Sequence, residues 1–465
     1  MNPLELDTLN QSLQEHLRAY PHRWIQFWTG NDKPTIIDWV FNNKTNSGWA
    51  VYNLSSDQSP ATLYQGFFEK TETGVSWPLY CQSLIDTVVE MFNDTQEYTT
   101  TKKGVLKWNG KIPDKSWTFS EELSFNRSTN CLSKISIGKH SLIIKEFKLM
   151  DRENGEVEFL TTLKNAGFTS GTKLHSSLIY KSYNNDQIPI IALVDYLQGE
   201  TLDTFLRNQV RLSPRNLNRA ANDSKFLMQL AGETLEKLHS LKFKTSDSDL
   251  FLNNIIYADD IIKECQTYIS KVDSALGVDL INLIDFNSFK SLPGIQSGVF
   301  HGDLHLSHFL IENSKCYLLD ISPPSKRSEV STGHPFRDLV RFRRALEYFW
   351  MDEALTALSQ ELNISEEDVL KYFRPEISDH LQADILSVFS RVCCEFRTWS
   401  DILYNDFKKT LGVTSMENKF SGWWDLFYLR ELLREADYNI SYGRTIFLEF
   451  DRYFLQNFQN ENIKK

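Results

Sequence analysis

Apolar and polar residues alternate in short runs along the first part of the chain, which is the pattern of half-buried β-strands. The alternating runs are residues 35–41, 48–52, 63–68 and 141–147. A short helix is expected at 84–92. The N-terminal part of the chain is therefore predicted to be rich in strands.

The pattern changes to a helical period further along the chain. A helix is expected at 155–164 and two more strands at 178–181 and 189–196. The period becomes helical after residue 200, and helical patterns dominate after about residue 331. The clearest helices are expected at 220–241, 339–351, 385–409 and 423–436. Strands come first, then strands with one helix, then mostly helices, so we predict an α+β architecture.

The length of the chain indicates more than one domain. At roughly 150 residues per domain, 465 residues predict about three domains. The polar stretch 93–116 is a candidate boundary. We therefore expect an N-terminal β-rich part at 1–115, a second β-rich part at 116–198 and a mainly helical part at 199–465.

The composition excludes several classes of partner. There are 50 Lys and Arg residues against 61 Asp and Glu, a net charge of −11, so no basic excess is present to bind nucleic acid. The longest apolar stretch, 188–194, is far shorter than the roughly 20 residues of a membrane span. The N-terminus is acidic and lacks the apolar segment of a secretory signal. Six cysteines without a C-x-x-C pair indicate free thiols in a reducing compartment, so we expect a cytoplasmic protein with no membrane partner.

The sharpest motif is a turn between two strand-like segments, which bears two aspartates and a histidine. VFHGDLHLSHFLI spans residues 299–311, and CYLLDI follows at 316–321. Phosphoryl transfer needs a carboxylate to orient the attacking hydroxyl, and oxygen-rich ligands to hold a divalent metal against the phosphates. Asp303, His308 and Asp320 have the spacing for these tasks.

This motif resembles the catalytic and metal-binding loops of aminoglycoside-phosphotransferase-like kinases. The resemblance narrows to maltokinases, with related bacterial glucosamine kinases, through Arg23-Trp24, residues 335–342 and residues 429–438. It implies a protein-kinase-like two-lobed fold with a β-rich N-lobe at 116–198, a mainly helical C-lobe at 199–465 and an N-terminal cap domain.

The resemblance also implies a role for each residue of the motif. Asp303 is the expected catalytic base and Asp320 the expected metal ligand. His301 is expected to brace the loop, and Asp338 matches the structural aspartate of the family. His305 either braces the loop or contacts the transferred phosphate.

His308 departs from the family pattern, which has asparagine or, in maltokinases, glutamine at this position. Imidazole is a poorer ligand for Mg²⁺ than an amide oxygen and favours softer metals. His308 could bind Mn²⁺, bind Mg²⁺ through water, or indicate lost catalysis.

A nucleotide site is expected in the β-rich N-lobe. Lys145, near the end of a strand, is expected to neutralise phosphate charge, held by a glutamate at the start of the next helix. Glu156 is preferred over Glu158 for this task. No G-x-G-x-x-G loop precedes Lys145, so hydroxyls and backbone amides would cap the phosphates instead. The other expected nucleotide-binding residues are Ser128, Thr129 and Asn130 in that loop, and Val194 and Tyr196 in the hinge that holds adenine.

The resemblance places substrate-binding residues near the C-terminus. They are Arg430, Glu431, Arg434, Glu435 and Tyr438. The four charged residues have i,i+4 spacing, so the alternative is a solvated helix face.

Together these features predict a small-molecule kinase of the EC 2.7.1 type, which uses ATP and Mg²⁺ or Mn²⁺ to phosphorylate a hydroxyl of a small sugar such as maltose or glucosamine. One alternative is a pseudokinase that binds nucleotide or a partner without transferring phosphate. A second is an aminoglycoside-type antibiotic phosphotransferase, because an acidic chain suits a cationic acceptor. The identity of the acceptor stays open.

Overall fold

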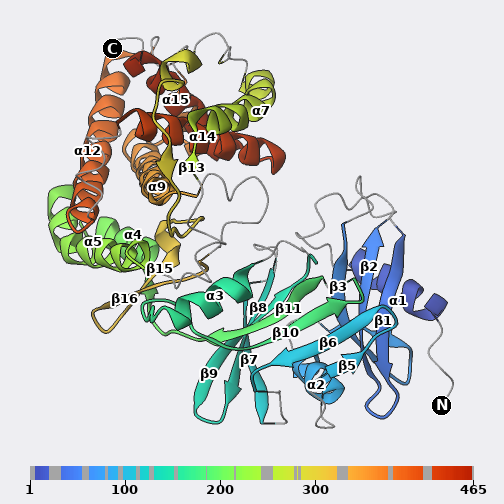
Figure 1. Ribbon diagram of the computed structural model, residues 1–465. Coiled ribbons are helices and arrows are strands. Elements are labelled where there is room, and N and C mark those ends of the chain that lie inside the picture. Colours follow the sequence, from blue (N-terminus) through green and yellow to red (C-terminus); the bar gives the residue numbers. More distant parts are fainter. Residues whose placement is uncertain are drawn as a thin grey trace. The chain divides into compact units, whose positions relative to one another are not determined.

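The computed structural model of the chain forms two compact units, shown in Figure 1. The N-terminal unit is Met1–Lys164 with Thr172–Leu197, and the C-terminal unit is Asn165–Gly171 with Gln198–Lys465. The described residues are 6–19, 33–54, 62–78, 82–92, 98–111, 116–124, 130–150, 155–184, 186–213, 216–241, 255–276, 280, 284–321, 333–374, 377, 381–411 and 421–462.

The first sheet of the N-terminal unit has four antiparallel strands in the order β1-β2-β3-β4. The strands are β1 (Pro34–Asn42), β2 (Ser47–Leu54), β3 (Tyr64–Lys70) and β4 (Val75–Ser76). Helix α1 (Leu6–Ala19) contacts β1 and β4. Its Leu9, Leu13 and Leu17 are buried at helical spacing, so one apolar face of α1 packs into the core of this sheet.

The second sheet has seven antiparallel strands in the order β5-β6-β10-β11-β9-β8-β7. They are β5 (Tyr98–Thr100), β6 (Gly104–Asn109), β7 (Trp117–Ser124), β8 (Asn130–Ile137), β9 (His140–Phe147), β10 (Leu174–Ser182) and β11 (Gln187–Asp195). Two helices complete the unit, α2 (Gln82–Met91) and α3 (Glu156–Asn165). The expected boundary at residue 115 stays a prediction, and strands from both sides of it pair in this one sheet.

One apolar core joins the two sheets. Trp49 and Phe67 come from the first sheet and Leu106 and Ile144 from the second, and Val88 of α2 lies among them. Helix α2 also contacts β2, β3 and β7. Trp49 of β2 faces this core, whereas its neighbour Ala50 faces the core that contains the leucines of α1, so β2 is buried on both faces and not half-buried as its pattern predicts.

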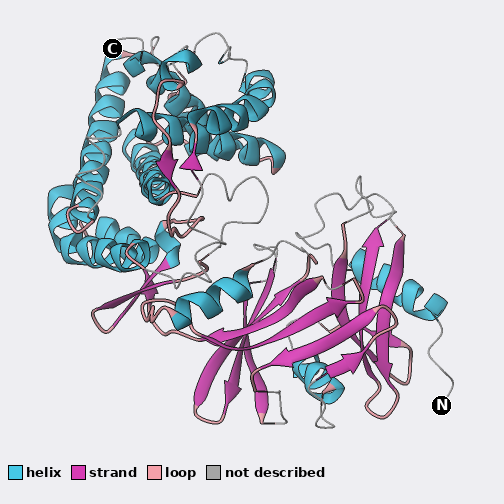
Figure 2. Cartoon of the chain, viewed as in Figure 1, coloured by secondary structure: helices cyan, strands magenta, loops and turns pink. Residues whose placement is uncertain are grey.

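Helices make up most of the C-terminal unit, as Figure 2 shows. They are α4 (Leu202–Leu212), α5 (Leu217–His239), α7 (Ala258–Leu276), α9 (Pro335–Leu362), α10 (Glu366–Lys371), α12 (Ala383–Lys408), α14 (Ser421–Ser441) and α15 (Thr445–Asn462). The short elements are β12 (Glu200–Thr201), β13 (Ile255–Ile256), η1 (Phe286–Phe289), β14 (Ile295–Gln296), η2 (Leu306–His308), β15 (Phe309–Glu312) and β16 (Lys315–Leu318). The expected α+β class is confirmed.

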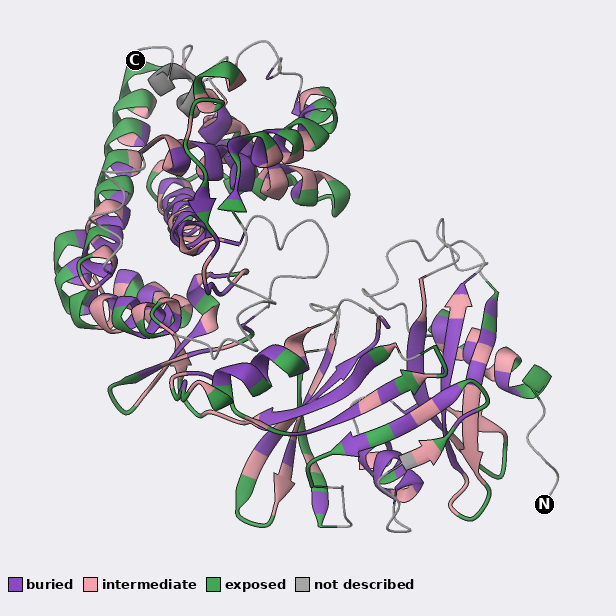
Figure 3. Ribbon diagram, viewed as in Figure 1, coloured by how far each residue is buried: buried purple, intermediate pink, exposed green. Residues whose placement is uncertain are grey.

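Helix α9 is the buried centre of this unit (Figure 3). It begins with His334 as N-cap and Pro335 in its first turn, where proline needs no hydrogen-bond partner. It ends at Asn363, which takes the left-handed conformation of a C-cap. Helices α10, α12, α14 and α15 contact it, so its first turn is held in one place.

Across the described residues, no helix combines the length and the apolar character that a membrane span requires.

Candidate active site

The hairpin of β15 and β16 places the two motif aspartates on neighbouring loops. The strands pair antiparallel, so the loop that precedes β15 and the loop that follows β16 lie at the same end. The Leu319 N–H donates to the carbonyl oxygen of His308 over 2.8 Å and joins the two loops. Asp303 lies on the first loop and Asp320 on the second.

Asp338, in the first turn of α9, holds the backbone of the first loop. Its Oδ2 accepts from the His301 N–H at 2.6 Å and lies 2.9 Å from Nε2 of His239, and its Oδ1 accepts from the Gly302 N–H at 3.0 Å. Burial would raise the pKa of this carboxyl, but the hydrogen bond and charge of His239 outweigh burial and lower it. The ionised carboxylate therefore fixes the chain directly before Asp303.

His301 is fully buried and connects the two loops. Its Nε2 donates to the carbonyl oxygen of Leu319 at 2.8 Å, and its Nδ1 accepts from the Asp303 N–H at 3.3 Å. Both ring nitrogens are thus used by a neutral imidazole, and burial lowers the pKa of the ring. These two hydrogen bonds join the ring to both loops, and the bracing role of His301 stays a prediction.

Asp303 forms an ion pair with Arg341, which the sequence interpretation did not assign to the site. Arg341 Nη1 donates to Oδ1 of Asp303, and its Nε donates to Oε2 of Glu431 at 3.0 Å. Burial acts to raise the pKa of the Asp303 carboxyl, but the Arg341 guanidinium outweighs it and holds that pKa well below its ordinary value. The signal was present, since Arg341 follows Asp338 by three residues and so shares a helix face with it.

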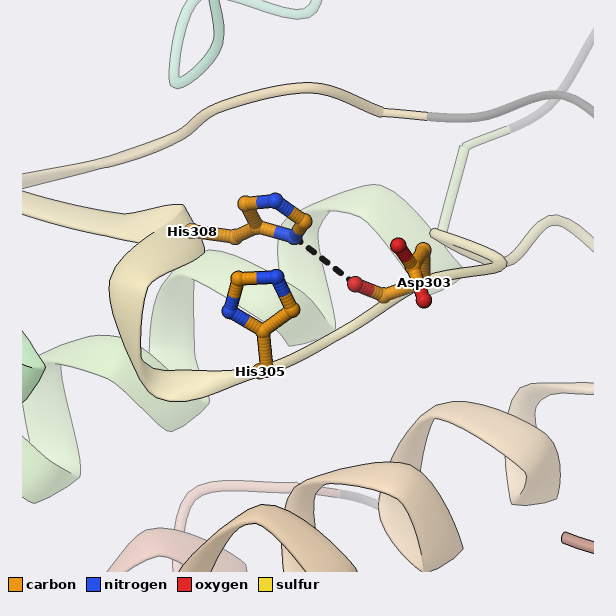
Figure 4. Close-up of side chains that lie close together, drawn as sticks. All are labelled: Asp303, His305 and His308. Carbon is orange, nitrogen blue, oxygen red and sulfur yellow. Dashed lines mark hydrogen bonds between the residues drawn. The ribbon is translucent and has the colours of Figure 1, made fainter. Parts of the chain in front are cut away.

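His308 lies between the two aspartates, and Figure 4 shows it above His305 and beside Asp303. Its Nδ1 donates to the carbonyl oxygen of Asp303 at 2.7 Å, and its Nε2 is 3.9 Å from Oδ2 of Asp320. Its ring lies 3.5 Å from that of His305 and 5.2 Å from that of His301, centroid to centroid. Burial, with the neighbouring His305, lowers the pKa of His308 to about 3.

These groups fit a divalent metal ion. Asp320 is half-exposed and has φ of 49°, a left-handed conformation that aspartate tolerates better than most residues. A carboxylate oxygen from Asp320 and an imidazole nitrogen from His308 would hold the ion, since oxygen suits Mg²⁺ and both suit Mn²⁺.

Lys145 and Glu156 form the expected ion pair in the N-terminal unit. Lys145 lies on β9 and Glu156 is the first residue of α3, with 2.8 Å between Nζ and Oε1. The side chains are 8% and 14% exposed, so solvent screens the pair less than a surface pair. The structure pairs Lys145 with Glu156 and not with Glu158.

Three of the other expected nucleotide-binding residues lie in or directly after strands of the seven-stranded sheet. Val194 is buried on β11, and Tyr196 follows that strand with its N–H donating to Ser141. Asn130 begins β8 opposite Phe147 of β9. Ser128 and Thr129 lie outside the described residues, as does the Arg23-Trp24 segment.

The residues on α14 that were expected to bind substrate differ in burial and in their partners. Glu431 is fully buried, and four arginines donate to it: Arg337, Arg341, Arg430 and Arg434. Glu435 accepts from the buried Arg344 at 2.9 Å. Tyr438 is 39% exposed and lies against Tyr442. Arg430 and Glu431 therefore belong to a buried ionic network, and Arg341 connects that network to Asp303.

Similarity to solved structures is clear although sequence similarity is low. No protein-family model matches the chain, and no curated protein matches its sequence. A glucosamine kinase structure aligns over 95% of this chain and 98% of that chain, with 12% identity and a TM-score of 0.58. Another, described as glucosamine kinase in complex with glucosamine, ADP and inorganic phosphate, aligns over 98% of this chain and 99% of that chain, with 10% identity and a TM-score of 0.54.

A third similar structure is an aminoglycoside phosphotransferase. It aligns over 74% of this chain and 96% of that chain at 9% identity. Its TM-score of 0.39 is too low to assign a fold to this chain. The glucosamine kinase structures establish the fold alone, and this chain shares their protein-kinase-like fold. The expected fold is thus confirmed.

Proposed function

We propose that the protein is a kinase that transfers the γ-phosphoryl group of ATP to a hydroxyl of a small sugar. The observation that supports this most is the arrangement at the β15–β16 hairpin, where Asp303 and Asp320 lie on either side of His308. An aspartate beside the attacking hydroxyl and a second one on the metal are the two carboxylates that phosphoryl transfer requires.

Asp303 would orient the acceptor hydroxyl through a hydrogen bond. Within the described residues, Arg341 is the one side chain that donates to the Asp303 carboxylate, and it uses Oδ1. Oδ2 can then accept from the substrate. Because the pKa of Asp303 is low, the proton moves to it late, as the oxygen–phosphorus bond forms and the bond to ADP breaks.

Lys145 would neutralise charge on the nucleotide phosphates. Its ion pair with Glu156 holds the ammonium group in place before the nucleotide arrives. A divalent ion on Asp320 and His308 would supply the remaining positive charge. Positioning and charge neutralisation are then the main sources of rate enhancement.

Support for a sugar acceptor and an adenine nucleotide comes from the similar glucosamine kinase, whose structure is described with glucosamine, ADP and inorganic phosphate. Mg²⁺ or Mn²⁺ is the proposed metal. A cytoplasmic location is also proposed, supported by the free thiols among the described residues.

The test is ADP formation by the full chain with glucosamine, maltose and an aminoglycoside, each with Mg²⁺ or Mn²⁺. Asp303→Asn should lower kcat with the best acceptor by at least about 100-fold. Asp223→Asn is the control, because Asp223 is an exposed carboxylate on α5. The proposal fails if no acceptor supports turnover with either metal, or if both variants keep the wild-type rate.

A pseudokinase is the second candidate, favoured by His308 at the metal position and by the Arg341–Asp303 ion pair. In that case ATP would raise the melting temperature, while no acceptor would support turnover. Replacing His308 by Gln separates the two candidates further, since activity gained by this variant would mark a decayed site.

A further inference from the structure

Two imidazoles and one carboxylate converge on the first loop of the site. Asp303, His305 and His308 each offer a ligand atom, and these atoms all lie within 4.8 Å of one another (Figure 4). All three residues come from a single loop that ends in η2, so their relative positions depend on one short stretch of backbone.

The backbone of this loop is fixed before any ligand arrives. The Asp338 carboxylate holds the amides of His301 and Gly302, and the His308 ring is oriented by its bond to the Asp303 carbonyl. Outer contacts of this kind orient the ligands of metal sites and raise their affinity.

His305 has no role in hydrogen bonding that would explain its position. Its side chain is partly buried, and across the described part of the chain its ring makes no hydrogen bond, nor does it cap η2. It lies instead against His308, with ring centroids 3.5 Å apart. The position of the His305 ring beside the Asp303 carboxylate therefore suits a metal ligand better than a residue that braces the loop.

The chemistry of the donor atoms indicates which kind of ion would bind. Arg341 pairs with Oδ1 of Asp303, which leaves Oδ2 of Asp303 to act as the carboxylate ligand beside the two imidazoles. Two nitrogens and one carboxylate oxygen form a donor set that first-row transition ions prefer over Mg²⁺.

We propose that Asp303, His305 and His308 bind a first-row transition ion of the Zn²⁺ or Co²⁺ type. This site shares His308 with the proposed nucleotide metal but uses Asp303 and His305 in place of Asp320. If the proposed function holds, an ion on Asp303 would withdraw the carboxylate that orients the acceptor hydroxyl. Zn²⁺ would then inhibit the kinase, and because His308 is shared, Mg²⁺ would compete with it.

The test is Co²⁺ binding to the untagged full chain, followed by the visible absorption of the bound ion, with Zn²⁺ and Mg²⁺ as competitors. We expect one equivalent of Co²⁺ that Zn²⁺ displaces and that a millimolar Mg²⁺ excess displaces poorly. His305→Ala should weaken Co²⁺ binding at least about tenfold, since loss of an outer contact alone has an effect of that size. His140→Ala, an exposed histidine of the N-terminal unit, is the control.

Circular dichroism and a melting curve would establish that His305→Ala is folded, and His305→Gln is the second variant if it is not. The proposal is overturned if the wild type binds no Co²⁺, or if His305→Ala and His140→Ala bind it equally. The visible absorption of bound Co²⁺ can be measured without turnover. Co²⁺ binding without kinase activity would therefore refute the proposed function alone. Kinase activity without Co²⁺ binding would refute the metal site alone.

Discussion

At the scale of single residues, the site depends on carboxylates held by partners distant in the sequence. Asp338 fixes the loop at His301, and Arg341 joins Asp303 to the buried Glu431. The contact between Lys145 and Glu156 could be predicted from the sequence, while the functional roles of Asp303 and Asp338 stay predictions. The spacing places Arg341 on the same face of α9 as Asp338, but its pairing with Asp303 depends on tertiary packing and could not be predicted from the spacing alone.

Replacing Arg341 by Gln should affect both stability and catalysis. Glu431 would lose one of its donors inside the protein, so we expect the free energy of unfolding to fall by about 1–3 kcal/mol. The pKa of Asp303 would rise, so the acid limb of the kcat/KM profile should move to higher pH. Urea unfolding and a pH–rate profile measure the two effects.

Arg391→Gln is the matched control for this variant. Arg391, on α12, also forms ion pairs with two acidic residues, Glu361 and Glu395, but its side chain is 47% exposed, whereas that of Arg341 is 4% exposed. Exposed ion pairs contribute about 0–1 kcal/mol, so this change should be nearly neutral. Equal effects of the two substitutions would contradict the role given to Arg341.

At the scale of elements, alternation and helical spacing located most strands and helices but not their partners. The expected helix 84–92 is α2, and the strand at 141–147 is β9. The pairing of β6 with β10, which brings Leu106 opposite Tyr180, has no local signal. Sheet membership therefore could not be predicted from the strand patterns alone.

Gly232 tests the packing of α5 against α12. A Cβ at this position would lie 2.2 Å from the carbonyl oxygen of Phe407 and 2.2 Å from Oγ1 of Thr410. Gly232→Ala should therefore lower the free energy of unfolding by about 1–3 kcal/mol, although alanine favours helices. Chemical denaturation measures the change.

Gly422→Ala, on α14, is the control for the packing prediction. There a Cβ would meet only the side chain of Leu292, which can move. We expect a change close to zero or a small gain in stability. If Gly232→Ala were as well tolerated as Gly422→Ala, the close approach of α5 and α12 would be wrong.

At the scale of the whole molecule, each unit contains a buried histidine that is neutral, so the free energy of unfolding should fall as the pH is lowered. Burial lowers the pKa of His16 to about 4 and that of His334 to about 3, against an ordinary value of 6.5. The unfolded chain binds more protons than the folded one between these values, so stability is complete above pH 6.5 and is lost as pH falls toward 3–4.

Urea unfolding at several pH values between 8 and 5 should thus show stability declining once the pH drops below about 6.5. His334→Asn should reduce this slope, because asparagine can still cap α9 but does not titrate in this range. A wild-type stability that is constant from pH 7.5 to 5 would contradict the neutral buried state of these rings.

The most direct test of the central claim is the stoichiometry of phosphate transfer. The full chain would be incubated with ATP, Mg²⁺ or Mn²⁺ and the acceptor that gives the fastest ADP formation, and phosphorus NMR would follow all phosphorylated species. We expect one sugar phosphate for each ADP formed, with both lost in Asp303→Asn. ADP that accumulates with inorganic phosphate and no sugar phosphate, or no ADP with any acceptor, would contradict it.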